Sequence, residues 1–375
     1  MQSYSLDFKL SKKKFADTIK VRFEDGRLLV PVSIDGRRYN FMLDTGASHA
    51  VVYNDAMIKG CVPIGMIPSN DAVNRKDTVE IVKLPPIQIG KITLTGCRAT
   101  LQNRRLKEKR IDGVLGFDLV NKGVQMKIDA RKGIMILTDR KHFFDSERGI
   151  EVKYSQKYHV PYIEVMPFCD YQDLFLFDTG SPRFLSINKK QFAENEAKMV
   201  NRKQIEGRSL GCVSIGYSGV EAMDEVVFLG LDNIKIGDLS LKDVHVITTQ
   251  GKSHLGASIM KYASVTFNPF KKTICFQPYN GENSLTVSNK QMEKAIVPSK
   301  NGQPMIGLIW EKSELYNAGL RAGDIILSID GRPLYSVTDY QMFLPIKNYV
   351  HLFTVKNRNG IIKEIKVPSK YLISQ

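Results

Sequence analysis

One short pattern occurs twice in the chain, namely an apolar stretch that runs directly into Asp-Thr-Gly. The first copy spans residues 41–46 (FMLDTG) and the second spans residues 175–180 (FLFDTG). A short apolar run bounded by a turn signal predicts a buried strand, and glycine permits a turn where a Cβ would clash. Each copy therefore predicts a strand that ends in a carboxylate.

The two aspartates, Asp44 and Asp178, are most informative as a pair. If the two turns meet face to face, both carboxylates share one site, and one of them holds a proton while the other stays charged. Such a pair can act as a general acid and a general base. A single aspartate at a turn is explained equally well by hydrogen bonds to nearby backbone N–H groups, but the repetition favours the paired site.

The pattern belongs to a longer internal repeat. Four elements recur in the same order in both halves: a hairpin ending in Asp-Thr-Gly, a second hairpin that turns at a glycine, an apolar-Gly stretch, and a further pair of strands. The matching segments are 28–43 with 160–177, 87–94 with 234–241, 112–116 with 254–256, and 126–134 with 265–274. An internal repeat of this kind predicts two related β-rich lobes.

Composition narrows the classes of function. The chain has 375 residues, of which 43% are hydrophobic and 25% charged, so it can form two or three folded domains. Its net charge of +15 suits an acidic partner. However, the basic residues are spread along the chain, and the one dense run, 104–110, has no aromatic residues for base stacking. We therefore expect no nucleic-acid partner, and no segment is long and apolar enough for a membrane span.

The cysteines and histidines predict neither a metal site nor a cofactor. The five cysteines have no close C-x-x-C spacing, which argues against a zinc site and a redox pair. Cys61 and Cys97 could form a bridge or remain two buried thiols. The six histidines have no metal-binding spacing, and His49 is interpreted as a loop or packing residue.

These motifs resemble those of aspartic peptidases of the pepsin and retropepsin superfamily, in which each lobe has Asp-Thr-Gly and a later apolar-apolar-Gly strand behind it. The resemblance implies a mainly β fold with two homologous retropepsin-like β-barrel lobes that form a cleft. Lobe one is expected at 21–148 and lobe two at 149–277, after an N-terminal extension at 1–20. Lobe one has Val114 in the later strand, whereas lobe two has His254 where an apolar residue is expected.

The resemblance also implies a role for each turn residue. Asp44 and Asp178 would be the catalytic pair that binds the attacking water. The residues that would support this dyad are Thr45, Gly46, Thr179, Gly180 and Ser181. The two threonines would form hydrogen bonds across the lobes and hold the dyad rigid.

Ser181 distinguishes the two turns, because lobe one has Ala47 at the same place. A hydroxyl directly after the glycine can donate a hydrogen bond to its own aspartate, and such a bond favours the charged form. We therefore expect Asp178 to be the charged partner more often and Asp44 to hold the shared proton more often, although the apparent pKa values belong to the pair.

Two loops are expected to close over a bound substrate as flaps. The first is at residues 69–78 in lobe one. The second is at residues 216–219 in lobe two and includes Tyr217 and Ser218. Binding residues are often found on loops that a rigid scaffold positions.

A third domain is predicted after the turn-rich polar run at 277–283, which has the composition of a linker. Residues 318–326 (AGLRAGDII) closely match the Ala-Gly-Leu-x-x-Gly-Asp-x-Ile signature of PDZ domains, and Asn359-Gly360 predicts a last hairpin. We expect a PDZ-like α+β domain at 284–375, with its own core. Such domains bind an extended peptide as an added strand beside a helix, here one that begins near Thr338.

The leading prediction is an aspartic-type endopeptidase, a hydrolase that needs no cofactor and cleaves a protein or peptide substrate. Its PDZ-like module would bind a substrate or partner peptide. The alternative is a non-catalytic adaptor that binds peptides in the cleft and in the PDZ-like groove. Two intact Asp-Thr-Gly turns favour the enzyme, because a scaffold has no physical need for two facing carboxylates. Bacterial proteins that resemble this arrangement are usually exported, so we expect a periplasmic or secreted location.

Overall fold

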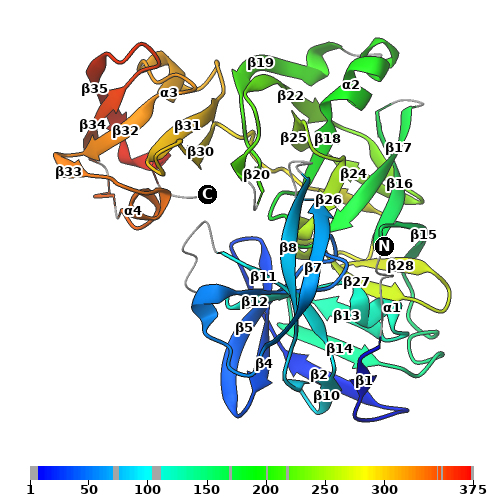
Figure 1. Ribbon diagram of the computed structural model, residues 1–375. Coiled ribbons are helices and arrows are strands. Elements are labelled where there is room, and N and C mark those ends of the chain that lie inside the picture. The colour runs from blue at the N-terminus through cyan, green and yellow to red at the C-terminus, as the bar shows by residue number, and fades with distance from the viewer. Residues whose placement is uncertain are drawn as a thin grey trace.

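The computed structural model describes residues 7–70, 76–103, 111–168, 171–199, 202–216, 219–343, 345–347 and 349–372. The described chain consists mainly of strands, which confirms the predicted fold class. In Figure 1 lobe one lies below lobe two, and the C-terminal domain lies beside lobe two. Among the described residues, no helix has both the length and the apolar character that crossing a membrane requires.

An 11-stranded sheet forms most of lobe one. Its strands are β1 (Lys9–Leu10), β3 (Arg22–Glu24), β4 (Arg27–Ile34), β5 (Arg37–Leu43), β6 (Ala50–Tyr53), β7 (Val62–Asn70), β8 (Lys76–Lys83), β9 (Ile87–Ile89), β10 (Ile92–Thr95), β11 (Arg98–Gln102) and β12 (Gly113–Leu115). The hairpin predicted around Asp35–Gly36 is β4–β5, and the one predicted at 87–94 is β9–β10. Strand β12 lies between β5 and β6, so the apolar-Gly strand passes beside the first Asp-Thr-Gly turn.

A 16-stranded sheet contains lobe two and also joins it to lobe one. Its strands are β2 (Ala16–Lys20), β13 (Gln125–Asp129), β14 (Ile134–Thr138), β15 (Ile150–Lys157), β16 (Val160–Phe168), β17 (Tyr171–Asp178), β18 (Leu185–Asn188), β19 (Ile205–Gly211), β22 (Asp224–Leu231), β23 (Ile234–Ile236), β24 (Leu239–Lys242), β25 (Val244–Thr249), β26 (His254–Gly256), β27 (Ala263–Asn268), β28 (Thr273–Pro278) and β29 (Ser284–Thr286). Strand β26 lies between β17 and β18, which repeats the position of β12 in lobe one.

The helices are short. The α-helices are α1 (Asp118–Asn121), α2 (Lys189–Asn195), α3 (Glu314–Asn317) and α4 (Val337–Gln341). The 3-10 helices are η1 (Asn54–Ala56), η2 (Glu196–Lys198), η3 (Arg202–Gln204), η4 (Ala257–Lys261) and η5 (Ser369–Tyr371). Because few apolar residues lie on them, the core is built mainly by the sheets.

The two lobes share one hydrophobic core. Strand β13 of the first half pairs antiparallel with β27 of the second half, with Met126 opposite Phe267. The ring of Phe267 stacks on Phe177, 5.4 Å between centroids, and meets the edge of Phe117 at 5.6 Å. Phe117 follows the apolar-Gly strand of lobe one and Phe177 precedes Asp178, so this aromatic group fixes the two turns relative to one another.

Residues 7–20, the described part of the segment that the sequence suggests as an extension, contribute strands to both sheets. Strand β1 pairs with β10, and β2 pairs with β14 along its whole length. Phe15, Asp17 and Ile19 are buried, and the residues between them are exposed. Because successive side chains of a strand point to opposite faces, these three residues form one face that is buried in the protein.

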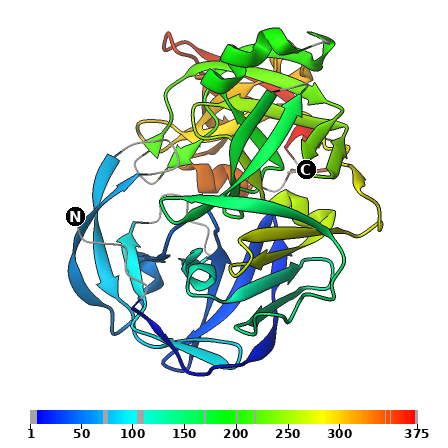
Figure 2. The same cartoon turned by 90° about the vertical axis from the view of Figure 1, so that its right-hand side faces the viewer.

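The C-terminal domain has a six-stranded sheet of its own. Its strands are β30 (Lys294–Pro298), β31 (Pro304–Ile309), β32 (Ile325–Ile329), β33 (Arg332–Pro333), β34 (Val350–Lys356) and β35 (Ile362–Pro368). The predicted hairpin around Asn359-Gly360 is β34–β35, and the helix expected near Thr338 is α4. Figure 2 shows this domain behind lobe two.

The boundary between lobe two and this domain lies later than residue 284. Strand β29 pairs in parallel with β24 of lobe two, and Leu285 and Val287 are buried in the core of the lobes. Further on, the Gln291 side chain donates a hydrogen bond to Glu206 of β19 at 2.8 Å. The segment that begins at Ser284 is therefore still part of lobe two, because its apolar residues complete that core.

The C-terminal domain packs against lobe two through β31. The backbone N–H of Cys212 donates to the carbonyl of Gly307 at 2.8 Å. Leu308 is buried in a cluster with Val213 and Phe228 of lobe two, and Trp310 contacts the Phe228 ring. A backbone hydrogen bond and an apolar cluster thus give the domain a defined position against lobe two.

Candidate active site

The first Asp-Thr-Gly turn begins where β5 ends. The backbone N–H of Asp44 donates to the carbonyl of Leu115 on β12 at 2.9 Å. Its carboxylate oxygen Oδ1 accepts hydrogen bonds from the backbone N–H groups of Gly46, at 2.8 Å, and Ala47, at 3.1 Å. The turn thus holds its own carboxylate in a fixed orientation.

The second turn has the same geometry. Asp178 is the last residue of β17 and lies beside Gly256 of β26 in a parallel register. Oδ1 of Asp178 accepts a hydrogen bond from the N–H of Gly180 at 2.9 Å. The carbonyl of Asp178 accepts from Ser181 at 3.2 Å, as the carbonyl of Asp44 does from Ala47. The repeated sequence therefore folds into repeated local structure.

The two threonines join the turns across the lobes. The N–H of Thr45 donates to Oγ1 of Thr179 at 3.0 Å, and the N–H of Thr179 donates to Oγ1 of Thr45 at 3.1 Å. Each hydroxyl in turn donates to a carbonyl of the opposite lobe, Thr179 to Leu43 at 2.8 Å and Thr45 to Phe177. Both threonines are fully buried. Four buried hydrogen bonds hold the turns face to face.

The two glycines leave space for the opposite aspartate. A Cβ added to Gly46 would lie 2.8 Å from Oδ1 of Asp178, and one added to Gly180 would lie 2.6 Å from Oδ2 of Asp44. Neither glycine has a positive φ. They are therefore required by the closeness of the two carboxyl groups rather than by a left-handed backbone, which the sequence alone does not reveal.

The paired carboxyl groups have different surroundings. Burial raises the pKa of Asp44 well above its ordinary value, and the charge of Asp178 and a hydrogen bond between the two carboxyl groups add to this increase. The N–H groups of Gly46 and Ala47 act in the opposite direction. A carboxyl group that keeps its proton beside a second carboxyl group is the arrangement of an acid and a base in one site.

The first Asp-Thr-Gly turn lies in a region that matches a known protein family. Residues 30–119 match the family model of aspartyl proteases. A second family model, that of the PDZ domain, matches residues 312–348. These matches confirm the resemblance inferred from the sequence, with an aspartyl protease domain in lobe one and a PDZ domain near the C-terminal end. The search of curated proteins finds no match for the chain.

The aspartyl protease match includes Asp44 and the strand that passes beside it, β12, but it ends before lobe two. Lobe two is related to the matched region by the internal repeat and by the same turn geometry. Asp178 is therefore assigned to the site because it lies opposite Asp44 in the structure.

The hydroxyl of Ser181 has a different partner from the one expected. It lies 2.9 Å from Nε2 of His254, a residue of the strand behind the turn. The partner expected from the sequence was the carboxylate of Asp178. The physical reason is that His254 occupies the position of an apolar residue and presents a ring nitrogen to the hydroxyl. The expected donation from Ser181 to Asp178 is therefore wrong for this arrangement of the two side chains.

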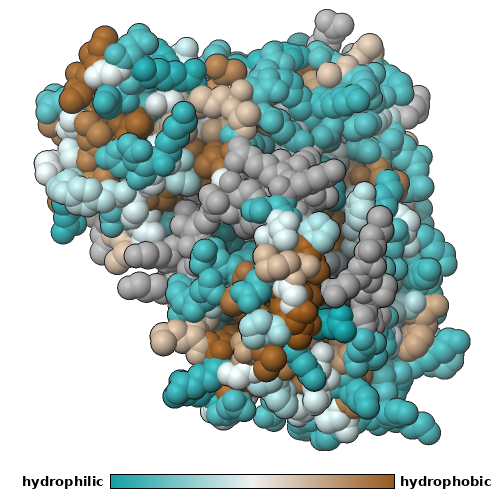
Figure 3. Space-filling view, in the orientation of Figure 1, coloured by the Kyte–Doolittle hydropathy of each residue, from teal (hydrophilic) through white to brown (hydrophobic). Residues whose placement is uncertain are grey.

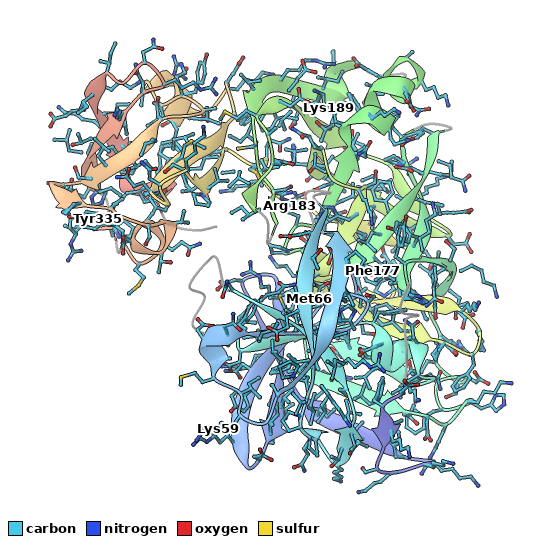
Figure 4. The ribbon with its side chains drawn as sticks, viewed as in Figure 1. Lys59, Met66, Phe177, Arg183, Lys189 and Tyr335 are labelled. Carbon is cyan, nitrogen blue, oxygen red and sulfur yellow. The ribbon has the colours of Figure 1, made fainter. Side chains whose placement is uncertain are left out.

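The protease lobe has a long hairpin at the place of the first expected flap. Strands β7 and β8 pair from Val62 opposite Lys83 to Asn70 opposite Lys76. The hairpin extends toward lobe two in Figure 1, and apolar atoms gather over it in Figure 3. Met66, labelled in Figure 4, lies on β7 and is 59% exposed. The tip of the candidate at 69–78 lies outside the described residues.

The second flap candidate belongs to a small hairpin of lobe two. Its strands are β20 (Ile215–Gly216) and β21 (Gly219–Val220), and its tip, Tyr217 and Ser218, lies outside the described residues. Oε1 of Glu221 accepts hydrogen bonds from the backbone N–H groups of Val213, at 2.6 Å, and Ser214, at 2.9 Å. Glu221 thereby closes the base of this hairpin.

Arg183 joins this hairpin to the second Asp-Thr-Gly turn. Arg183 lies five residues after Asp178 in the chain. Its guanidinium donates a hydrogen bond to the carbonyl of Val213 at 2.8 Å. Figure 4 labels Arg183 in lobe two, near the β7–β8 hairpin in that view. Neither Arg183 nor Glu221 was predicted, because both lie in loops without a motif. His254 is recognisable in the sequence, because it departs from the apolar-apolar-Gly pattern.

The four cysteines that the structure describes form no disulfide. Cys61 and Cys97, which could have formed a bridge, are free thiols, as are Cys212 and Cys275. Burial raises the pKa of Cys97 to about 12. In the part of the chain that the structure describes, no group of three or more His, Cys, Asp or Glu side chains is arranged to hold a metal ion.

Proposed function

We propose that the chain is an aspartic-type endopeptidase in which Asp44 and Asp178 activate a water molecule. The charged Asp178 takes a proton from the water as the oxygen attacks the peptide carbonyl. The protonated Asp44 gives its proton to the carbonyl oxygen, which forms a tetrahedral intermediate. As the C–N bond of the intermediate breaks, Asp178 gives its proton to the leaving nitrogen and Asp44 takes a proton back from a hydroxyl of the intermediate, so the products are an amine and an acid. Water is the nucleophile and no cofactor takes part.

The observation that supports this proposal best is the face-to-face pair of carboxyl groups held by the threonines. Burial of an ionisable group costs free energy, and a cleft that only binds peptides gains nothing from it. The pair therefore favours catalysis over the alternative, a non-catalytic adaptor.

Cleavage can be tested with a diverse peptide library read out by mass spectrometry, with and without pepstatin. We expect new peptide termini that increase with time and that pepstatin suppresses. The Asp44→Asn protein, prepared in the same way, is the control for a contaminating peptidase. Cleavage that is equal in this control would overturn the proposal, and stable retention of peptides without cleavage would favour the adaptor.

We further propose that the PDZ domain binds an extended peptide of a substrate or partner. Strand β30 is at one end of the domain's sheet, and α4 packs against β30 and β31. An added strand could therefore form hydrogen bonds with β30 beside α4. The same peptide library, immobilised and screened with the Asp44→Asn protein to prevent cleavage, tests whether such a peptide is retained.

The spacing of the dyad can be tested with Gly180→Ala. We expect this variant to lose cleavage while remaining folded, because the new Cβ would lie within 2.5–2.8 Å of the Asp44 carboxyl group and the backbone itself is unstrained. Gly36→Ala is the matched control. Gly36 has φ +74° and open space around it, so alanine there should cost about 1–2 kcal/mol of stability without loss of cleavage.

Activity and thermal unfolding of both variants, measured side by side, distinguish the two effects. If Gly180→Ala cleaved peptides at the parent rate, the close approach of the two carboxyl groups would not be required.

A further inference from the structure

Lobe two has a serine and histidine pair where lobe one has two apolar residues. Ser181 takes the place of Ala47, directly after Asp-Thr-Gly, and His254 takes the place of Val114 in the strand behind the turn. The hydroxyl of Ser181 lies 2.9 Å from Nε2 of His254. The two polar side chains thus contact each other beside the dyad, whereas the corresponding residues of lobe one can form no such bond.

The backbone at these positions is the same in both lobes. The N–H of Phe117 donates to the carbonyl of Ala47 at 2.8 Å, and the N–H of Ala257 donates to the carbonyl of Ser181 at 2.8 Å. The same backbone hydrogen bond thus holds Ala47 and Ser181 in the two lobes, and the side chains at these positions differ.

The contacts of His254 determine which ring nitrogen carries the hydrogen. Nδ1 lies 3.2 Å from the carbonyl oxygen of Lys252, and a carbonyl oxygen can only accept, so Nδ1 carries the hydrogen. In the neutral ring Nε2 is then an acceptor. The Ser181 hydroxyl therefore donates to Nε2, and its hydrogen is not available to Asp178.

Two charged groups act electrostatically on the His254 ring. One is the carboxylate of Asp178 at the end of β17, and the other is the guanidinium of Arg183 in the following loop. Burial lowers the pKa of His254 from its ordinary value, the charge of Asp178 acts in the opposite direction, and Arg183 adds to the decrease. The ring is therefore neutral near pH 7 and gains a proton in acid.

The other charged side chains near β26 have different partners. Asp173 of β17 accepts a hydrogen bond from the Ser253 hydroxyl at 2.6 Å. The ammonium group of Lys252 lies over the rings of Tyr158 and Tyr162. From β18, the residues paired with β26 are Leu185 and Ser186, which carry no charge.

We propose that His254 is a positioning residue for the dyad, whose ring determines whether the Ser181 hydroxyl donates to the ring or to Asp178. This inference rests on the proposed peptidase function. When the ring is neutral, the hydroxyl donates to Nε2. When the ring gains a proton, Nε2–H donates to Oγ of Ser181, and the hydroxyl hydrogen becomes free to donate to Asp178. That bond and the nearby positive charge both stabilise the negative charge on Asp178.

The proposal predicts that the dyad stays active at lower pH. As the pH falls, protonation of His254 stabilises the charged form of Asp178. The charged form is needed because it takes the proton from water. The acidic limb of the pH–rate profile should therefore extend to lower pH than it would with the apolar pair of lobe one.

The test exchanges the residues of lobe two for those of lobe one. We expect the double variant of His254→Val and Ser181→Ala to move the acidic limb upward by roughly one pH unit, because both the charge and the hydroxyl donor are lost. Each single variant should give a smaller upward shift. His254→Val loses the charge but leaves the Ser181 hydroxyl free to donate to Asp178, and Ser181→Ala loses the hydroxyl but keeps the charge. His142→Asn, a change to an exposed histidine, is the control and should leave the profile in place.

A second measurement does not depend on activity. The titration of the His254 ring can be followed by NMR in the parent protein and in Asp178→Asn, where we expect the midpoint to fall because the opposite charge is removed. If the parent protein cleaves no peptide, the proposed function fails, but this titration still tests the pair.

An unchanged acidic limb in His254→Val, or an unchanged His254 midpoint in Asp178→Asn, would overturn the proposal. If the valine variant does not fold, His254→Gln replaces it, because glutamine stays polar but cannot titrate. The same upward shift of the acidic limb is then expected, and its absence would again overturn the proposal.

Discussion

Replacement of Asp44 or of Asp178 by asparagine is expected to lower the rate of peptide cleavage by roughly four orders of magnitude. Each change removes one of two groups that act as a unit, so the double variant should be no slower than either single variant. Rates are measured with a peptide from the library that the parent protein cleaves. Asp129→Asn is the matched control, since Asp129 is also buried in the first half but bonds to Lys132 and Tyr279.

The asparagine variant at position 44 should also show that the dyad destabilises the fold. The pKa of Asp44 is raised in the folded protein. The folded state therefore binds its proton more tightly than the unfolded state does, and stability falls as the pH rises above the unfolded pKa. Asparagine does not titrate. The gain in unfolding temperature of Asp44→Asn over the parent should thus be small in acid and larger near neutral pH.

Two results would contradict these expectations. Cleavage by both single variants near the parent rate would show that the carboxyl groups are not a catalytic pair. A gain in stability that is equal at all pH values would show that burial of the Asp44 charge is not its cause.

The repeated motif made most of the site predictable. Two strands that end in Asp-Thr-Gly can meet only if the lobes face one another, and the threonines and glycines of both copies lie where that symmetry requires. The role of the glycines was not predictable, because it depends on the distance from Gly180 to the opposite carboxyl group. The partner of Ser181 was missed for a similar reason, since His254 is 73 residues away in the chain.

The strand pairings between distant segments also could not be predicted from the sequence. Alternation of apolar and polar residues predicts that 126–129 is a strand, but it does not show that β13 pairs with β27 of the other half. The same holds for β2 and β29, which complete sheets far from them in the chain. The expected export to the periplasm or the exterior rests on the resemblance alone and stays a prediction.

The position of β29 changes what removal of the PDZ domain should do. The sequence indicates a linker that ends near residue 283 and a domain with a separate core. In the structure, Leu285 and Val287 are only 3% and 4% exposed, and they belong to the core of the lobes. Burial of such side chains contributes about 1.5–3 kcal/mol each, so a chain that ends at Tyr279 should lose about 3–6 kcal/mol of stability. That is a large share of the stability of an ordinary domain.

A chain that ends at Glu293 keeps these two residues and removes the PDZ domain itself. It should fold, but it loses the contacts that the domain makes at the base of the β20–β21 hairpin, including Leu308 with Val213. Gly307 accepts the hydrogen bond from Cys212 on one side of that base. Arg358 contacts the sulfur of Met223 on the other side.

We therefore expect three distinct behaviours from the full chain and the two shorter ones. The chain that ends at Tyr279 should unfold at a much lower denaturant concentration than the chain that ends at Glu293. The latter should cleave short peptides, more slowly than the full chain because the hairpin has lost its support. It should also lose most of its activity on long protein substrates, because the proposed peptide site beside α4 is gone. Equal stability of the two shorter chains would show that β29 does not belong to lobe two. Full activity of the longer one on protein substrates would show that the PDZ domain neither selects substrates nor supports the hairpin.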